Sequence, residues 1–160
     1  MRYRDKILDR AKVVARVAEE RRAGKRVVFT NGCFDLMHVG HVRYLAAARE
    51  AGDLLVVAIN DDASVRRLKG PERPLVPEAA RAEVLAALAA VDYVTTFGED
   101  TPAEIIAALL PDVLVKGADW APDQVVGRDI VEAKGGRVVL IPVVEGFSTT
   151  ALVERLRRDG

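Results

Sequence analysis

The strongest constraint on the fold of this chain is the alternation of short apolar segments with longer helical ones. Residues 53–60 (DLLVVAIN) and 112–117 (DVLVKG) are nearly continuous apolar runs, as is typical of strands buried on both faces of a parallel sheet. Shorter β-rich runs at 26–31, 92–97 and 137–143 bring the set to about five strands. Helical segments separate them, which predicts right-handed βαβ units in one open sheet with helices on both faces.

Helical patterns fill the intervals between the strands. They are expected over five ranges, 38–52, 78–91, 101–110, 122–136 and 148–158, with a further short helix over 61–69. Residues 5–23 form one further helix, which ends before Gly24. Thr101 is the expected N-cap of its helix, with Pro102 in the first helical position. Residues 69–77 contain a glycine and three prolines, so we expect a loop there.

A chain of 160 residues is short enough to form a single domain. We therefore expect a Rossmann-like α/β domain over residues 25–160, preceded by the helix of residues 1–24. Ligands of such sheets bind beyond the carboxyl ends of the strands, where the strand order reverses. Three segments follow strand ends and are expected to meet there: FTNGCFDLMHVGH (29–41), KGADW (116–120) and EGFSTT (145–150).

Composition argues against several classes of protein. Lysine and arginine total 24, as do aspartate and glutamate, so the formal net charge is +0, which argues against binding of nucleic acid or a membrane surface through bulk charge. The single cysteine cannot form an intramolecular disulfide, which favours a reducing cytoplasm. The charged N-terminus has no apolar signal-peptide core, and no apolar stretch reaches the roughly 20 residues that a membrane helix needs.

Both histidines of the chain, His38 and His41, lie three residues apart at the expected start of a helix. Positions i and i+3 share one helix face, so both imidazoles can point at one ligand. A helix N-terminus also attracts anions through its free N–H groups and its dipole, and Gly40 lets a ligand approach the backbone closely. The pattern predicts a phosphate clamp that stabilises charge as it grows during a reaction.

Two other interpretations of the histidine pair are two half-buried residues and a metal site. The first is disfavoured because both histidines fall in one glycine-flanked turn after a strand. Metal ligation is disfavoured because the chain has no further histidine and its only cysteine, Cys33, lies in the same loop. The chain also lacks a G-x-G-x-x-G fingerprint after its first strand and a G-x-x-x-x-G-K-[ST] phosphate loop. No protein-bound metal is expected, and phosphate binding is assigned to the His-x-Gly-His turn.

Residues outside this turn are candidates for the same site. Lys69, in the segment RRLKGPERP, is either a mobile cation that closes over phosphates or a solvated surface lysine. Arg73 and Arg81 have the same two interpretations, with the solvated one favoured. Asp119 and Trp120 follow a strand end, where a turn aspartate and a packed tryptophan are the plain alternative.

The last helix opens with Ser148, Thr149 and Thr150. Hydroxyls at this position are typical helix N-caps, and together with free amides they also bind phosphate oxygens. Gly146 leaves room just upstream. Cys33 is not expected to act as a nucleophile, because no base is assigned to it.

The motifs GCFDLMHVGH (32–41), KGADW (116–120) and EGFSTT (145–150), in this order, resemble the cytidylyltransferase-like branch of the nucleotidyltransferase superfamily. The likeness runs from residue 25 to the end of the chain. Within the superfamily, the segments ASVRRLKGPERP and LVKGADW are similar to D-glycero-β-D-manno-heptose 1-phosphate adenylyltransferases. In that family the domain often follows a sugar kinase on the same chain.

The resemblance implies a reaction of ATP with heptose 1-phosphate that yields ADP-heptose and pyrophosphate. An oxygen of the sugar phosphate attacks the α-phosphorus in line, without a covalent enzyme intermediate. His38, His41 and Lys69 are the implied catalytic residues. The implied nucleotide-binding residues are Cys33, Phe34, Gly40, Gly117, Asp119, Gly146, Ser148, Thr149 and Thr150, with Arg81 as a candidate phosphate contact. Mg²⁺ is expected to accompany the ATP.

The resemblance also favours a cytoplasmic homodimer. A separate sugar kinase is expected to supply the acceptor, because residues 1–24 form only one helix. The alternative is a glycerol-3-phosphate cytidylyltransferase or another alcohol-phosphate nucleotidyltransferase. Related glycerol-3-phosphate cytidylyltransferases carry an arginine after the proline of the last strand, where this chain has Val143 and Val144. A non-catalytic nucleotide-binding module is disfavoured, since such a module would be expected to lose a histidine, Lys69 or the hydroxyls.

Overall fold

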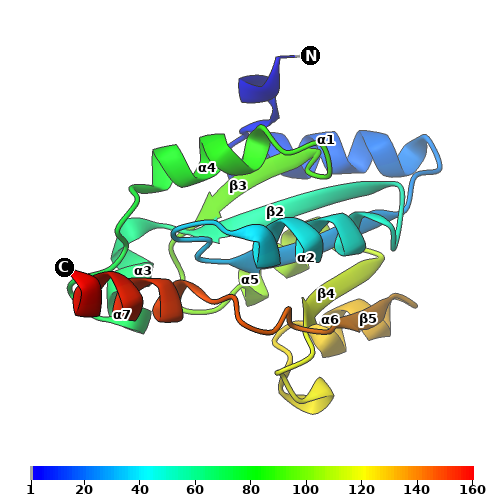
Figure 1. Ribbon diagram of the computed structural model, residues 1–160. Coiled ribbons are helices and arrows are strands. Elements are labelled where there is room, and N and C mark those ends of the chain that lie inside the picture. Colours follow the sequence, from blue (N-terminus) through cyan, green and yellow to red (C-terminus); the bar gives the residue numbers. More distant parts are fainter. Residues whose placement is uncertain (1) are drawn as a thin grey trace.

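The structure is a computed structural model that describes residues 2–160. The five expected strands form one parallel sheet in the order β3–β2–β1–β4–β5 (Figure 1). They are β1 (Val27–Gly32), β2 (Leu54–Asn60), β3 (Tyr93–Phe97), β4 (Val113–Gly117) and β5 (Arg137–Ile141). Every neighbouring pair is parallel. The predicted open Rossmann-like sheet is therefore confirmed.

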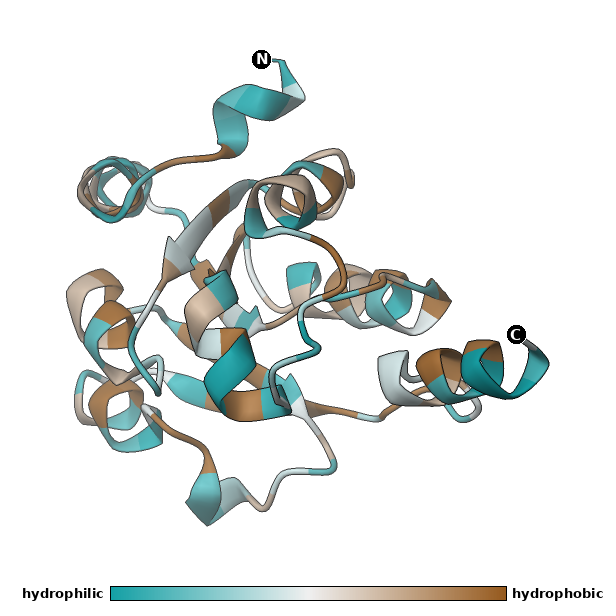
Figure 2. Ribbon diagram, turned by 90° about the vertical axis from the view of Figure 1, so that its left-hand side faces the viewer, coloured by the Kyte–Doolittle hydropathy of each residue, from teal (hydrophilic) through white to brown (hydrophobic). Residues whose placement is uncertain are grey.

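Helices cover both faces of the sheet (Figure 2). They are α1 (Arg10–Arg22), α2 (Val39–Arg49), α3 (Asp62–Lys69), α4 (Glu78–Ala86), α5 (Ala103–Leu109), α6 (Arg128–Ala133) and α7 (Thr149–Asp159), with 3₁₀ turns η1 (Tyr3–Lys6) and η2 (Pro122–Gln124). In the part of the chain that the structure describes, none of the helices combines the length and the apolar character needed to cross a membrane.

Two apolar clusters, one on each face of the sheet, form the core. Successive strand residues point to opposite faces, so Phe29 and Val56 pack with α1, α5 and α6, whereas Val28 and Val57 pack with α2 and α4. Strand β2 is buried at every position, which explains its unbroken apolar run. Helix α1 contributes the fully buried Val13, so the N-terminal helix belongs to the same core as the sheet.

The strand order reverses between β1 and β4. The chain runs outward from β1 through β2 to β3, then crosses back to β4 and ends the sheet at β5. Open α/β sheets bind ligands beyond the strand ends at such a point. Figure 1 shows α3 and α7 gathered at this carboxyl edge, so the fold brings the three expected motifs together.

Several helix boundaries differ from the expectation. The helix expected over 5–23 begins only at Arg10, because Ile7 and Asp9 are extended and Tyr3–Lys6 form the separate turn η1. The helix expected over 78–91 ends at Ala86.

The helix expected over 122–136 is interrupted, and only η2 and α6 form, because Gly127 adopts a φ of +90° that an α-helix does not contain. Lys69 is the last residue of α3, so the glycine- and proline-rich loop begins one residue later, at Gly70.

The predicted cap of α5 is also wrong. Pro102, not Thr101, is the N-cap, and its carbonyl accepts the first helical hydrogen bond, from the amide of Ile106 at 2.9 Å. Thr101 Oγ1 accepts only a long bond of 3.4 Å from the Ala103 amide. The helix therefore starts one residue later than its sequence signature suggests.

Candidate active site

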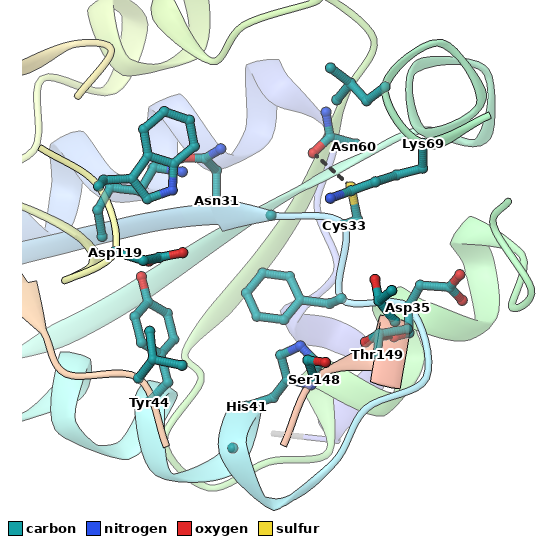
Figure 3. A pocket seen from close by; sticks show the side chains of 18 of the residues that line it. Asn31, Cys33, Asp35, His41, Tyr44, Asn60, Lys69, Asp119, Ser148 and Thr149 are labelled. Atoms are coloured by element: carbon teal, nitrogen blue, oxygen red, sulfur yellow. Dashed lines mark hydrogen bonds between the residues drawn. The ribbon is translucent and has the colours of Figure 1, made fainter. Parts of the chain in front are cut away.

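A cavity of about 660 Å³ opens at the carboxyl edge of the sheet. Its wall is built from the loop after β1, the starts of α2 and α7, the end of α3 and the ends of β4 and β5. Most of the predicted site residues line it: Cys33, Phe34, His38, Gly40, His41, Lys69, Asp119, Ser148, Thr149 and Thr150. In Figure 3, His41, Ser148 and Thr149 lie on one side of the cavity, and Cys33, Asn60 and Lys69 lie on the other.

The two histidines are fixed by the backbone of the first turn of α2. His38 is the N-cap, and its Nδ1 accepts a hydrogen bond from the Gly40 amide at 3.1 Å. His41 Nδ1 accepts from the His38 amide at 3.2 Å, and the two ring centroids are 4.0 Å apart. Because each Nδ1 is an acceptor, each neutral ring carries its proton on Nε2. The pair therefore offers two N–H donors for a ligand in the cavity.

Both imidazoles are neutral near pH 7. Burial lowers the pKa of His38. Burial, followed by the nearby His38, lowers the pKa of His41 to about 4. The predicted phosphate clamp is thus made of neutral donors rather than of two cations.

Gly40 allows a close approach between the starts of α2 and α7. A Cβ at Gly40 would lie 2.8 Å from Cε1 of His38 and 3.3 Å from Cβ of Phe147. The Phe147 ring stacks on the His38 ring with centroids 6.1 Å apart. The sequence predicted that Gly40 makes room for a ligand, whereas in the structure it makes room for these two side chains.

The start of α7 lies beside the histidine turn, on the same side of the cavity. Ser148 is its N-cap, with Oγ accepting from the Ala151 amide at 3.0 Å, which confirms the capping interpretation. The Thr149 hydroxyl donates to the Asp35 carbonyl oxygen at 2.6 Å and so ties α7 to the loop after β1. Two helix N-termini, those of α2 and α7, therefore border one cavity, an arrangement that favours anions.

Arg73 is held in an ion pair, not solvated as the sequence suggested. Its Nε donates to Oδ2 of Asp35 at 2.8 Å, and both side chains are largely buried. Burial acts to raise the pKa of Asp35, but bonds from the amides of Leu75 and Val76 and from Arg73 outweigh it and lower the pKa. Asp35 was missed by the sequence analysis, although its place inside the GCFDLMHVGH motif is a signal that could have found it. Lys69 is exposed at the rim of the cavity.

Arg81 is neither solvated nor a phosphate contact, which corrects both interpretations. Only 1% of it is exposed. Its guanidinium donates to the carbonyl oxygens of Cys33, Asn60 and Val76 and to Asp62 Oδ1, at 2.6 to 2.9 Å. These bonds engage Nε and both terminal nitrogens of the guanidinium, and they hold the ends of β1 and β2 together beneath the site.

Gly117 and Gly146 lie outside the cavity wall and shape it indirectly. A Cβ at Gly117 would lie 2.5 Å from Oδ1 of Asp119, so the glycine leaves space for that carboxylate. Gly146 adopts a φ of +82° in the turn before α7, a conformation that glycine reaches without strain.

The cysteine does not have the properties of a nucleophile. Burial raises the pKa of the Cys33 thiol, against the lowering effect of Lys69 and two arginines. Its Sγ lies 3.7 Å from Oδ1 of Asn60. A thiol with a raised pKa is protonated and weakly reactive at neutral pH.

Lys116 and Tyr44 are the main cavity residues that the sequence analysis missed. Lys116 lies near the end of β4, and burial lowers its pKa to about 8. The Tyr44 hydroxyl is 2.7 Å from Thr30 Oγ1 and donates to the carbonyl oxygen of Val115 at 3.2 Å. The available signal for Lys116 was its position in an otherwise apolar strand, because a lysine there needs either solvent or a binding partner for its ammonium group.

Comparison with known proteins places this geometry in a family. Residues 29–155 match the model of the family described as Cytidylyltransferase-like. The chain belongs to the cytidylyltransferase-like family. It is 64% identical over 137 residues to "Bifunctional protein HldE" of Syntrophotalea carbinolica and 58% identical over 151 residues to that of Trichlorobacter lovleyi. These matches cover 86% and 94% of this chain but only 28% and 31% of the relatives, so the chain spans less than a third of their length.

Solved structures agree with the family assignment. The lipopolysaccharide core biosynthesis protein of Thermoplasma volcanium superposes with a TM-score of 0.62 at 27% identity, over 75% of this chain and 97% of that one. Pantothenate synthetase of Thermus thermophilus superposes with a TM-score of 0.58 at 17% identity, over 89% of this chain and 68% of that one. The second likeness concerns the fold alone.

We expect the Arg81→Met substitution to lower the free energy of unfolding by about 3 kcal/mol, because it leaves Asp62 and three carbonyl oxygens without their donor. The matched control is Arg66→Met on the exposed side of α3, which should change stability by less than about 0.5 kcal/mol. Urea unfolding followed by circular dichroism measures both. Equal effects of the two substitutions would contradict the role given to Arg81.

His41 gives the fold a measurable pH dependence. Its pKa of about 4 in the folded chain lies below the ordinary 6.5, so the unfolded chain binds the proton more readily and stability is lost as the pH falls through 6.5 towards 4. Between pH 7 and pH 5, we expect the wild type to lose about 1 kcal/mol more than His41→Gln, after allowance for partial exposure of the ring. Urea titrations at both pH values test this, and the same loss in both proteins would refute it.

Proposed function

We propose that this chain is an adenylyltransferase that transfers AMP from ATP to D-glycero-β-D-manno-heptose 1-phosphate, giving ADP-heptose and pyrophosphate. The observation that carries the proposal is the meeting of two helix N-termini at one cavity, with the Nε2–H donors of His38 and His41 at one of them. Such a site suits a chain of phosphates, because each N-terminus favours negative charge.

The triphosphate of ATP is placed across these two N-termini. The α-phosphate lies against His38 and His41, and the β- and γ-phosphates lie at the start of α7 with Ser148 and Thr150. The histidine donors are held in place before the reaction by the amides of His38 and Gly40. Fixed donors stabilise charge on the transferring phosphate without reorganisation during the step.

The acceptor needs no general base. An oxygen of the sugar 1-phosphate forms a bond to the α-phosphorus, the bond to the bridging oxygen of the β-phosphate breaks, and pyrophosphate leaves. A phosphate monoester has a second pKa near 6, so its nucleophilic oxygen is already ionised at pH 7. Neutral histidines suit this reaction, because their task is to donate hydrogen bonds rather than to remove a proton.

We propose that Mg²⁺ enters the site with the triphosphate. Mg²⁺ prefers oxygen ligands and is usually shared between substrate phosphates, water and one or two protein groups. Asp119 and Asn31 line the cavity, and the amide oxygen of Asn31 is buried without a hydrogen-bond partner. Oxygens of these two side chains fit such an ion, which would neutralise charge on the departing pyrophosphate.

The heptose assignment is supported by the resemblance of the RRLKGPERP segment and by the neighbour titled as a lipopolysaccharide core biosynthesis protein. The GADW segment resembles glycerol-3-phosphate cytidylyltransferases as well, so it does not separate the two substrates. The expectation of a separate kinase is revised, because the relatives named bifunctional are more than three times as long as the matched segment. We infer that in those relatives a sugar kinase shares the chain. The homodimer stays a prediction.

The first test crosses two nucleotides with two acceptors and measures pyrophosphate release with Mg²⁺. We expect release with ATP and heptose 1-phosphate, and none when Mg²⁺ is chelated. Release only with CTP and glycerol 3-phosphate would keep the mechanism and replace the substrates with those of the alternative cytidylyltransferase. No release in any combination, with ATP still binding, would favour the non-catalytic module.

The second test is His41→Ala. We expect kcat to fall by about 10²–10³-fold or more, because a fixed donor to the transferring phosphate is lost, while the melting temperature stays near that of the wild type. Arg43→Ala, on the exposed side of the same helix, is the matched control and should retain full turnover. Near-normal kcat in His41→Ala would exclude the mechanism.

A further inference from the structure

Lys116 is a cavity residue that the roles above leave unused. It lies one residue before the carboxyl end of β4, the neighbour of β1 at the point where the strand order reverses, and its side chain lines the cavity. The Trp120 ring covers it, with its centroid 5.5 Å from Nζ. Among residues 2–160, the lysines that form ion pairs are Lys12, Lys25 and Lys134. Lys116 therefore holds its charge beside an aromatic ring without a carboxylate partner.

The cavity has few cations to offer to its substrates. His38 and His41 are neutral near pH 7, and the charge of Arg73 is matched by Asp35. Within the described chain, the lysines that line the cavity are Lys69 and Lys116. Two phosphorylated substrates that must approach each other repel strongly, so the site needs positive charge to offset that repulsion. The two lysines can supply it.

The two lysines reach the cavity from different elements. Lys69 ends α3, Lys116 lies near the end of β4, and both line the cavity. Figure 3 shows Cys33 and Lys69 across the cavity from His41 and Ser148, which border the proposed triphosphate position. Lys69 thus lies on the side of the cavity that the triphosphate leaves free.

We propose that Lys116 binds the phosphate of the acceptor from the β4 side of the cavity, opposite Lys69 on α3. The inference rests on the proposed function, because it requires a phosphorylated acceptor. A dianionic phosphate gives the ammonium charge-assisted hydrogen bonds in place of the weaker contact with Trp120. It also brings the nucleophilic oxygen to the α-phosphate with part of its charge compensated.

The ionisation of Lys116 is consistent with this role. Burial lowers its pKa to about 8, against the raising influence of Cys33 and Asp119. The charged form is still the major one at pH 7, and a bound phosphate stabilises it further. Lys116 is half-buried, and a partly desolvated charge without an ion-pair partner costs folding free energy, so removal of this charge should not harm the fold.

The test uses Lys116→Met and Lys116→Gln, with Lys12→Met on the exposed surface of α1 as the matched control. Trp120 is the only tryptophan of the chain and lines the cavity, so its fluorescence reports binding there. Three ligands are titrated separately: inorganic phosphate, heptose 1-phosphate and a non-hydrolysable ATP analogue. Melting temperatures and steady-state kinetics accompany the titrations.

We expect both Lys116 variants to weaken the binding of inorganic phosphate and heptose 1-phosphate by about 10–100-fold, with binding of the ATP analogue changed less than about twofold. KM for the acceptor should rise while KM for ATP is kept, and the melting temperature should not fall. Weaker binding of the ATP analogue instead, no change for any ligand, or failure of both variants to fold would each overturn the proposal.

The design separates this inference from the proposed function. If the wild type binds inorganic phosphate through Lys116 but shows no turnover with heptose 1-phosphate, the substrate assignment fails and the role of Lys116 stands. If turnover with heptose 1-phosphate is normal and the Lys116 variants keep the wild-type KM for it, the adenylyltransferase stands and the role of Lys116 fails.

Discussion

The site depends most on the buried guanidinium of Arg81. Parallel strands have no covalent link at their carboxyl ends, so a cavity at that edge needs a device that fixes the strand ends relative to one another. Arg81 provides it by donating to the carbonyl oxygens of Cys33 and Asn60, at the ends of β1 and β2. The same group bonds to Asp62 at the start of α3, the helix that ends with Lys69. One buried side chain thus sets the relative positions of the histidine loop and the helix that carries Lys69.

With the strand ends fixed, the cavity divides its electrostatic work between two kinds of group. In the proposed reaction, neutral donors on helix N-termini, His38 and His41 above all, meet the phosphate that is transferred, and their geometry is set by backbone amides. Full charges come from lysines on the other side of the cavity, where they lack carboxylate partners. A hydrogen-bonded neutral group costs less to bury than a charge does. The imidazoles are accordingly held within the fold, whereas Lys69 is exposed and Lys116 is only half-buried.

The sequence predicts the sheet well, because a strand buried on both faces, such as β2, is apolar at nearly every position. The motifs at the strand ends also predict most of the cavity wall. The sequence does not predict Arg81 or Lys116. An arginine among alanines reads as a surface residue, and its acceptors, Cys33 and Asn60, lie 48 and 21 residues away in the chain. No sequence pattern indicates where the ammonium group of Lys116 points. The helix expected over 122–136 is interrupted at Gly127, where the positive φ favours glycine, so the glycine within the helical pattern was the signal for the break.

Helix α7 shows how substrate and fold depend on each other. It has no fully buried residue, and its start is attached to the site by the bond from Thr149 to the Asp35 carbonyl oxygen and by the stacking of Phe147 on His38. Most of what positions this helix therefore belongs to the cavity rather than to the core. A triphosphate that bridges the starts of α2 and α7 adds contacts that exist only when α7 is in place, so binding must favour that arrangement. In the proposed complex the histidine loop, α7 and the nucleotide form one cooperative unit, while the two lysines are carried by α3 and β4.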